Sequence, residues 1–237
     1  MPQKPALKNI TLRRQIISTC QEMNALGINQ GTSGNVSARV GKSFLITPSG
    51  VPYDKMKPDQ IVEMDFKSGY RGKWLPSSEW RMHMDLLAAR PEAGAVIHTH
   101  AMYATALSTL RIDIPAFHYM IGVTGGTSLK CSGYAEFGTQ ALSDTMLKAL
   151  EGRTACLLAN HGMICFGPSL DKALWLAHEI EILCQQYYIA TQAGLPIILN
   201  DAQMESVLKR FKTYGKQSDE LAEGDAAAVD APVHRGN

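Results

Sequence analysis

Three histidines are the residues of this chain whose type and spacing point most directly to chemistry. His98 and His100 lie one residue apart at the end of the apolar run AVIHTH, and His161 lies in the later triplet NHG. Alternate residues of a strand project to the same side, so His98 and His100 can bind one ion. A third histidine would complete a zinc site that keeps one position open for a substrate. The pattern therefore predicts a catalytic zinc site, although an HxH pair alone is also typical of buried histidines held by hydrogen bonds.

Glu79 is the candidate for proton transfer beside such a metal ion. It lies in the stretch PSSEWRMHM. A carboxylate in a desolvated pocket can bind and release a proton near neutral pH, which is what an acid/base group must do. The stretch also predicts a helix that begins at a serine cap, Ser77 or Ser78, with Glu79 in its first turn. The alternative for Glu79 is therefore an ordinary acidic residue stabilised by the helix dipole.

Three short segments rich in glycine and hydroxyl residues predict an anion site. They are GTSGN at 31–35, TPSG at 47–50 and the serine pair at 77–78. Glycine lets backbone N–H groups approach a phosphate, hydroxyl groups supply further donors, and a helix N-terminus adds a favourable potential. Each segment alone is typical of an ordinary turn, but the three together indicate a phosphate pocket.

Hydrophobic periodicity predicts the elements that position these residues. Strands are expected at 36–40, 44–47, 61–66, 95–100 and 154–159, and helices at 11–26, from 77 onward, at 103–110, 137–150, 169–194 and 201–214. Residues 115–134 are expected to form a long connection. His83 and His178 fall on predicted helices, where they are expected to be core residues or to support the site. The pattern predicts one domain over 1–215 and a flexible tail over 216–237, because the tail contains too little apolar material to pack.

Composition excludes several classes of partner. The chain has 237 residues, of which 45% are hydrophobic and 19% charged, which suits one globular domain. Lys and Arg total 23 against 22 Asp and Glu, so no nucleic acid or anionic membrane is expected as a partner. The chain has neither an apolar run long enough for a membrane span nor a signal-peptide core, so we expect a cytoplasmic location. The five cysteines lack a CxxC pair and are expected to be reduced.

The order of the motifs along the chain resembles the class II aldolase/adducin family. The matching segments cover residues from about 10 to 215 and are NQGTSGNVS, LITPSG, LPSSEWRMHM, IHTHA, IPAFHYMI, YAEFGT, NHG, KALWLAHE and FKTYG. The resemblance implies an α/β fold, a single three-layer α/β/α domain with a central mixed, largely antiparallel sheet. It also implies a homotetramer whose active sites lie at subunit interfaces.

The resemblance assigns roles to individual residues. It implies zinc on His98, His100 and His161, with Glu79 as a further ligand that leaves the metal to become the acid/base group; Co2+ or Mn2+ are substitutes that such ligands accept. Tyr119 would reach the active site of a neighbouring subunit. The implied phosphate pocket consists of Thr32, Gly34, Asn35, Thr47, Ser49, Ser77 and Ser78. The implied aldehyde side consists of Phe137, Phe211 and Tyr214.

The implied reaction is the reversible retro-aldol cleavage of a deoxyketose 1-phosphate to dihydroxyacetone phosphate and a small aldehyde. The metal acts as a Lewis acid, Tyr119 takes the proton of the C4 hydroxyl, and Glu79 protonates C3. L-fuculose 1-phosphate and 5-deoxy- or 5-methylthio-pentulose 1-phosphates are the candidate substrates. The alternatives are a pentulose-phosphate 4-epimerase or a dehydratase of the same fold, and a non-catalytic adducin-like scaffold module.

Overall fold

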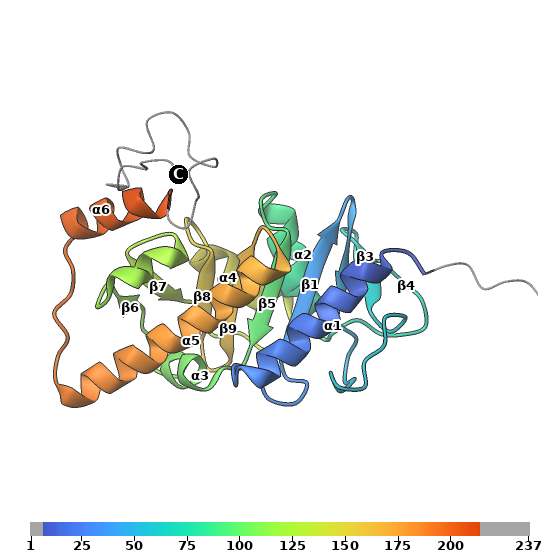
Figure 1. Ribbon diagram of the computed structural model, residues 1–237, viewed down its shortest axis with the longest axis horizontal. Coiled ribbons are helices and arrows are strands. Elements are labelled where there is room, and N and C mark those ends of the chain that lie inside the picture. Colours follow the sequence, from blue (N-terminus) through green and yellow to red (C-terminus); the bar gives the residue numbers. More distant parts are fainter. Residues whose placement is uncertain (1–6, 214–237) are drawn as a thin grey trace, which may run out of the picture.

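A computed structural model describes residues 7–213 of the chain. These residues form three layers, with one mixed sheet between two layers of helices (Figure 1). Tyr214 and the predicted tail over 216–237 lie outside the described residues. The helices are α1 (Ile10–Ala25), α2 (Trp80–Ala89), α3 (Met102–Ser108), the 3-10 helix η1 (Tyr119–Thr124), α4 (Gln140–Ala149), α5 (Leu170–Ala193) and α6 (Asp201–Phe211). The strands are β1 (Asn35–Val40), β2 (Ser43–Ile46), β3 (Val62–Asp65), β4 (Tyr70–Arg71), β5 (Ala95–Thr99), β6 (Ile114–Pro115), β7 (Ser128–Cys131), β8 (Ala155–Leu158) and β9 (Gly162–Gly167).

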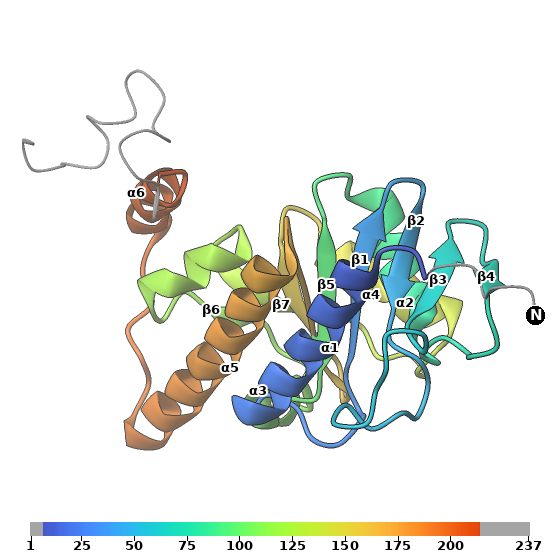
Figure 2. The ribbon, with the colours of Figure 1, turned by 45° about the vertical axis from the view of Figure 1, so that its right-hand side comes forward.

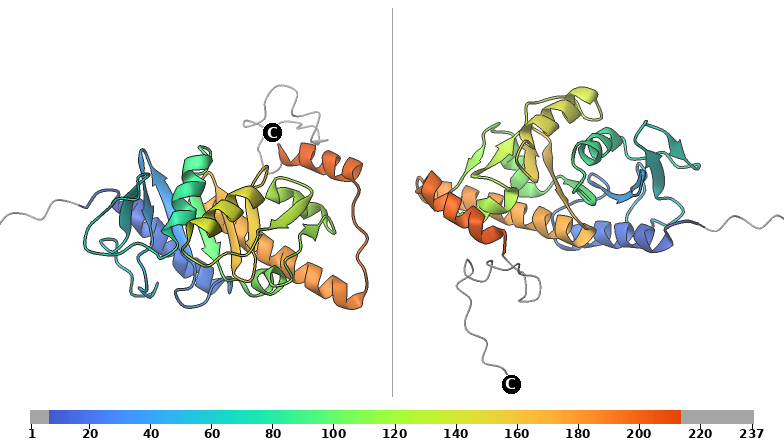
Figure 3. Two further views of the ribbon diagram at one scale, coloured as in Figure 1. Left: turned by 180° about the vertical axis from the view of Figure 1, so that it is seen from behind. Right: turned by 90° about the horizontal axis from the view of Figure 1, so that it is seen from above.

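The strands lie in the order β4-β3-β2-β1-β5-β9-β8-β7-β6. Only the β7–β8 pair is parallel in this sheet, so the prediction of a mixed, largely antiparallel sheet is confirmed. Helices α1 and α5 cover one face (Figure 2), and α2 and α4 cover the other, as the view from above in Figure 3 shows.

Side-chain alternation along β5 explains the two apolar cores. Ala95 and Ile97 pack toward α1 and α5, whereas Val96 packs toward α2 and α4. His98 follows the alternation of Val96 and therefore faces the layer of α2. Strand β1 follows the same rule, since Val36 and Ala38 belong to the core beneath α1 and α5. This leaves Asn35 and Ser37 on the side of α2.

Two of the predicted turn segments are tied to each other by backbone hydrogen bonds. Ser77 N donates to Thr47 O over 2.9 Å, and Ser49 N donates to Leu75 O over 3.0 Å. Thr47 Oγ1 in turn accepts from Val36 N at the start of β1. The segments 47–50 and 75–78 therefore lie side by side at one end of the sheet.

Helix α2 begins later than the sequence indicates. The serine cap predicted at Ser77 or Ser78 is wrong, because the helix starts at Trp80 and Glu79 is the residue before its first turn. Ser77 Oγ instead accepts a hydrogen bond from Glu79 N over 3.3 Å. The prediction that 115–134 is a plain connection is also incomplete, since it contains η1 and β7. By contrast, the helix predicted over 169–194 begins where expected, and Ser169 caps α5 with its Oγ accepting from Lys172 N.

The five cysteines, all within the described residues, are unpaired, as predicted. None of the helices between residues 7 and 213 combines the length and the apolar character needed to cross a membrane.

Candidate active site

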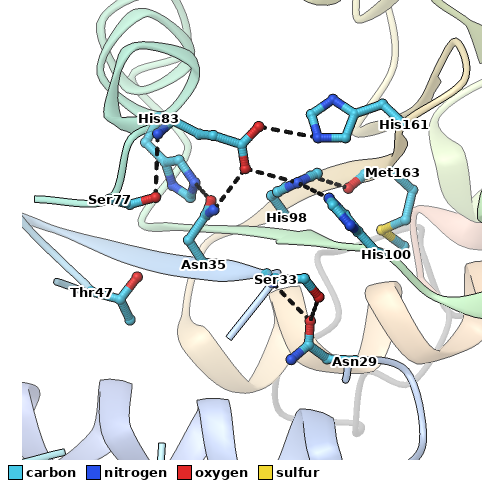
Figure 4. A network of polar contacts seen from close by, with 12 residues as sticks. Asn29, Ser33, Asn35, Thr47, Ser77, His83, His98, His100, His161 and Met163 are labelled. Carbon is cyan, nitrogen blue, oxygen red and sulfur yellow. Dashed lines mark hydrogen bonds and ion pairs between the residues drawn. The ribbon is translucent and has the colours of Figure 1, made fainter. Parts of the chain in front are cut away.

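Four side chains from three parts of the fold meet at one end of β5. His98 is the fourth residue of β5, His100 follows its end, and Glu79 precedes α2. His161 lies in the turn between β8 and β9, just after Asn160, which adopts a left-handed conformation with φ of 55°. One ligand atom from each of Glu79, His98, His100 and His161 lies within 4.8 Å of all the others. The predicted convergence of the three histidines is confirmed (Figure 4).

The geometry of these four side chains fits a metal ion. Glu79 Oε2 lies 3.1 Å from His98 Nε2, and Glu79 Oε1 lies 3.1 Å from His161 Nε2. Glu79 Oε1 is buried without a well-aligned hydrogen bond, and His100 Nε2 faces His98 Nε2 at 3.1 Å. Two imidazole nitrogens and an orphaned carboxylate oxygen directed at one point are what a shared cation would satisfy. Three imidazoles and one carboxylate are also a donor set that suits zinc.

The second ring nitrogen of His98 is fixed by the backbone. His98 Nδ1 lies 2.9 Å from Met163 O, and a carbonyl oxygen can only accept, so Nδ1 carries the hydrogen. The neutral ring therefore presents the lone pair of Nε2 to the other three side chains. This arrangement, in which the nitrogen remote from the metal donates to a carbonyl, is the usual support for a ligating histidine.

Electrostatics couple the carboxylate to the histidines. Burial by itself would raise the pKa of Glu79, but His98 and His161 beside it hold the pKa of its carboxyl well below its usual range. Burial would lower the pKa of His98, yet the adjacent Glu79 carboxylate raises it above 6.5. Burial, together with the neighbouring His98 and His161, lowers the pKa of His100 to about 4. Without a metal ion, His98 is therefore the ring that shares a proton with Glu79.

A chain of hydrogen bonds continues behind Glu79. Asn35 Nδ2 donates to Glu79 Oε2 over 3.0 Å, and the Oδ1 of the same amide contacts His83 Nε2. Ser37 Oγ lies 2.7 Å from the other ring nitrogen of His83. Asn35, Ser37 and His83 are buried. His83 therefore supports the site, which is one of the two roles expected from its place on a helix.

A cavity of about 670 Å³ opens beside the four side chains. Its lining combines three of the predicted ligands with residues from the predicted anion loop and from the segment before α4. The lining residues are Thr32, Ser33, Ser78, Glu79, His100, Tyr134, Ala135, Glu136, Phe137, Asn160 and His161. The cavity is large enough for a sugar phosphate and has a polar and an aromatic side.

The residues predicted to bind phosphate fall into an exposed and a buried group. Thr32 and Ser78 are exposed and line the cavity, whereas Ser49 lies with Ser77 and Ser78 in an adjoining hollow of about 330 Å³. Asn35, Thr47 and Ser77 are buried. Ser78 therefore links the two hollows.

Gly34 allows close packing in the same loop. Gly34 N donates to Asn29 Oδ1 over 2.9 Å, and Asn29 also accepts from Ser33. A Cβ atom at Gly34 would lie 2.5 Å from Asn29 Oδ1 and 2.7 Å from His98 O. Glycine therefore lets the loop pass directly against the strand that carries His98.

The aromatic residues predicted for the site do not all line the cavity of this chain. Phe137 lines the cavity, but Tyr119 and Phe211 are not among its lining residues within the described chain. Tyr119 begins η1, is 49% exposed and stacks on Phe211 of α6 with ring centroids 6.4 Å apart. A Cβ at Gly122 would lie 2.7 Å from the Phe211 ring, so α6 packs tightly on η1. Tyr214 lies outside the described residues.

Sequence reasoning gave no site role to several residues of the cavity wall, among them Tyr134, Glu136 and Asn160. Tyr134 and Glu136 lie in the segment between β7 and α4, and Asn160 precedes the third histidine. Arg111 contacts both Asn160 and Tyr134. Its Nε donates to Asn160 Oδ1 over 2.6 Å, and its Cζ lies 5.2 Å from the centroid of the Tyr134 ring. Asn160 had a usable signal, since asparagine before glycine-containing turns often adopts the left-handed region. Tyr134 had only the resemblance of its segment YAEFGT to the family, because an aromatic residue in a predicted connection has no periodic pattern.

Comparisons with known proteins agree with this site. Residues 14–188 match the family model described as Class II Aldolase and Adducin N-terminal domain. The chain is 49% identical over 210 residues to the L-fuculose phosphate aldolase of Escherichia coli K12, covering 88% of this chain and 98% of that relative. It is also 49% identical over 206 residues to the 5-methylthioribulose-1-phosphate/5-deoxyribulose-1-phosphate aldolase of Rhodospirillum rubrum, covering 87% and 93%.

A solved structure agrees as well. An L-fuculose 1-phosphate aldolase superimposes with a TM-score of 0.83 at 36% identity, covering 87% of this chain and 98% of the other. The chain therefore belongs to the family of the Class II Aldolase and Adducin N-terminal domain, and within it to the aldolases.

Proposed function

We propose that this protein is a metal-dependent aldolase that reversibly cleaves a deoxyketose 1-phosphate to dihydroxyacetone phosphate and a small aldehyde. The observation that carries the proposal is the convergence of Glu79, His98, His100 and His161 beside a cavity with an aromatic wall. An adducin-like scaffold has no need of a buried carboxylate among three histidines. The names of the two relatives supply the class of substrate.

The three histidines and Glu79 would hold zinc, with Co2+ or Mn2+ as substitutes. A divalent ion bound there would polarise the substrate carbonyl as a Lewis acid and stabilise the negative charge that develops during cleavage. The chain's own residues would place the carbonyl end of the substrate next to His100 and His161, which line the cavity.

Glu79 would carry the proton of the reaction. Burial is the largest single influence on the pKa of Glu79 and raises it. The combined effect of His98 and His161 is larger, lowers the pKa and keeps the carboxylate ionised. A Glu79 side chain that rotates away from the histidines loses that stabilisation, so its pKa rises and it becomes able to give a proton to C3. Its position just before α2 allows such a rotation without breaking a helical hydrogen bond.

The phosphate would lie where the two hollows meet at Ser78. Thr32 and Ser49 are exposed and can turn their hydroxyl groups toward it, and the backbone at 77–78 lies at the start of α2. Ser77 and Thr47 are buried and hold these segments together through Ser77 N and Thr47 O. Gly34 and Asn35 complete the predicted pocket; the Asn35 amide is partly used by Glu79 and His83, which leaves one Nδ2 hydrogen for the substrate.

The remaining half of the chemistry would come from a neighbouring subunit of a homotetramer. Tyr119 would take the proton from the C4 hydroxyl as the bond between C3 and C4 breaks, and the electron pair stays on C3 until Glu79 protonates it. One proton leaves C4–OH and one reaches C3, so the reaction is balanced overall. Tyr119 gains the proton and Glu79 loses one, so a proton must return from Tyr119 to Glu79 through solvent before the next turnover. The support is that Tyr119 is exposed and does not line the cavity of its own chain.

The aldehyde would contact Phe137, with Phe211 and Tyr214 on the same side of the substrate. Phe137 is 64% exposed at the cavity, which leaves its ring free to cover a small apolar group. The aldehyde differs between the substrates of the two relatives, so the choice between L-fuculose 1-phosphate and a 5-deoxy- or 5-methylthio-pentulose 1-phosphate depends on this wall. The unpaired cysteines suit a cytoplasmic location, where thiols stay reduced.

A panel of ketose 1-phosphates tests the proposal. The zinc-loaded protein is incubated with L-fuculose 1-phosphate, 5-deoxyribulose 1-phosphate and 5-methylthioribulose 1-phosphate, and kcat/KM is measured by the release of dihydroxyacetone phosphate. We expect cleavage of at least one, with activity lost after chelation and restored by zinc. An epimer or a dehydrated product without triose phosphate would instead identify the 4-epimerase or the dehydratase. A purified protein that lacks a stoichiometric divalent metal and cannot regain one would support the scaffold.

A further inference from the structure

The polar chain behind Glu79 ends on His83 and Ser37, to which no step of the proposed reaction assigns a role. Both side chains are completely buried, and Asn35 connects them to the carboxylate. Figure 4 shows the His83 ring between the Asn35 amide and the start of α2. Burying polar side chains such as these destabilises the fold unless their hydrogen bonds are made. Each hydrogen bond in the chain must therefore have one donor and one acceptor.

The directions follow from what each atom can do. The ionised Glu79 carboxylate can only accept, so Asn35 must present Nδ2 to it, as it does at 3.0 Å. Asn35 Oδ1 then faces His83 Nε2, which must donate. A neutral imidazole has one N–H, so His83 Nδ1 is an acceptor and Ser37 Oγ donates to it over 2.7 Å. Every hydrogen in the chain therefore points toward Glu79.

The fold supports the same arrangement in two ways. Asn35 and Ser37 alternate along β1 and project to one side, and His83 on α2 lies four residues after Glu79, the residue that precedes this helix. Burial lowers the pKa of His83 to about 3, so the ring stays neutral and keeps a single N–H. Helix and strand together leave His83 one partner on each ring nitrogen.

We propose that His83 is a positioning residue for Glu79: its Nε2–H holds the Asn35 amide in the one orientation that donates a hydrogen bond to the Glu79 carboxylate. A reversed amide would present Oδ1 to the carboxylate and repel it. The Asn35 hydrogen bond thereby sets where the carboxylate rests between its partners and where it starts when it moves a proton. This inference rests on the proposed function for its effect on turnover, but not for the orientation itself.

Two variants separate the hydrogen bond from mere packing. His83→Leu removes the donor, and we expect kcat to fall by about 10- to 100-fold, the usual cost of losing such a supporting group, with metal content unchanged. His83→Gln places an amide N–H where Nε2 lies and should retain most of kcat. The exchange of the C3 proton of dihydroxyacetone phosphate with solvent should fall in His83→Leu as much as cleavage does, because Glu79 performs that exchange.

Leu86→Ala is the matched control, since Leu86 is completely buried on the same helix but packs in the apolar core. It should lower the melting temperature at least as much as His83→Leu while leaving kcat near the wild-type value. A wild-type kcat in His83→Leu, or a loss in His83→Gln as large as that in His83→Leu, would overturn the proposal.

The orientation is tested without any substrate. In the metal-free, 15N-histidine-labelled protein, the His83 signal is identified by its absence in His83→Gln, and its nitrogen shifts should show the neutral Nε2–H form. A Nδ1–H form would overturn the proposal, and because wild-type protein is used, the test holds even if His83→Leu does not fold. A protein with the Nε2–H form that cleaves none of the three ketose 1-phosphates would contradict the proposed function while supporting the orientation of Asn35.

Discussion

Asn35 of β1 and His98 of β5 lie directly opposite each other in an antiparallel pair of strands. Both contact the same atom, Glu79 Oε2, at 3.0 Å from Asn35 Nδ2 and 3.1 Å from His98 Nε2. A one-residue slip between the strands would place these two side chains on opposite faces of the sheet. The register of this strand pair therefore determines the environment of the Glu79 carboxylate.

The first prediction concerns Glu79 itself. Glu79→Gln should keep the fold and most of the metal, because three histidines remain, but it should lower turnover by about two orders of magnitude or more, the usual scale for a lost acid/base group. Steady-state cleavage and metal analysis of the same preparation check it. Glu92→Gln, an exposed carboxylate on the surface, is the control and should behave as wild type. Near-normal turnover in Glu79→Gln would refute the role.

The second prediction concerns proton release on metal binding. The raised pKa of His98 means that this ring keeps its proton to a higher pH than an ordinary histidine does, and a metal ion bound there would displace it. Titration calorimetry in buffers of different ionisation enthalpy should therefore show proton release at pH 7 that diminishes by pH 9. Metal affinity should rise over the same range. Equal proton release at both pH values would contradict the coupling of His98 to Glu79.

The same pair gives the metal-free protein a pH optimum of stability. The pKa of Glu79 is lowered in the folded protein, so its contribution is present above 4.5 and is lost as the pH falls toward the lowered value. The pKa of His98 is raised, so its contribution is full below 6.5 and is lost as the pH rises through the raised value. The lowered pKa values of His83 and His100 act in the opposite sense, because the contributions of these rings are lost as the pH falls below 6.5. Melting temperatures of the metal-free protein should therefore be highest near pH 6.5, and a monotonic rise toward pH 9 would contradict the assignment.

The third prediction concerns the glycine against His98. Gly34→Ala places a Cβ within 2.7 Å of His98 O, and backbone atoms must move to accept it, at a cost of about 1–3 kcal/mol in the free energy of unfolding. The anion loop moves with it, so KM for the phosphorylated substrate should rise. Denaturant unfolding and steady-state kinetics measure the two effects. Gly133→Ala is the control, since the nearest atom to its Cβ would be Thr145 Cγ2 at 3.5 Å.

The fourth prediction concerns Tyr119. Tyr119→Phe should slow cleavage of the whole substrate more than it slows C3 proton exchange of dihydroxyacetone phosphate, because only cleavage requires a base at the C4 hydroxyl. Equal losses in both assays would contradict this division of roles.

A complementation experiment tests whether Tyr119 acts across subunits. Tyr119→Phe and His98→Ala chains are each expected to be nearly inactive alone. Co-expressed in equal amounts, they should regain about one quarter of the wild-type activity, because each interface site then draws its two halves independently. No recovery in verified mixed oligomers would place Tyr119 within its own chain's site.

The fifth prediction concerns the aldehyde wall. Phe137→Ala should reduce kcat/KM for the 5-methylthio substrate by about 10-fold more than for the 5-deoxy substrate, because sulfur and its methyl group gain more from an aromatic ring. The melting temperature should stay near that of the wild type, since the side chain is 64% exposed. An unchanged ratio of the two kcat/KM values would remove Phe137 from the wall.

Repeating local patterns in the sequence predicted where the site histidines lie. Contacts between residues far apart in the sequence could not be predicted in this way. Alternation in AVIHTH predicted that His98 and His100 share a side, and the apolar strand before NHG predicted where His161 emerges; both follow from local geometry. No local pattern could show that Asn35 would pair with His98, since that depends on strand order in the sheet. The same limit hid the contact of His83 with Asn35, which joins residues 48 positions apart.

The segment between β7 and α4 has a consequence for how new activities arise in this fold. It supplies Tyr134, Ala135, Glu136 and Phe137 to the cavity, and its two aromatic rings are 59% and 64% exposed. Glu79, His98, His100 and His161, which we propose to bind the metal and move the proton, belong instead to a strand end, a turn and the residue before a helix. Mutations can therefore explore new aldehydes in this segment with little penalty to folding or to bond cleavage. Substrate choice can therefore change without changes in the residues proposed to bind the metal and move the proton. A library of variants confined to residues 134–137 should yield proteins with altered aldehyde preference more often than inactive proteins.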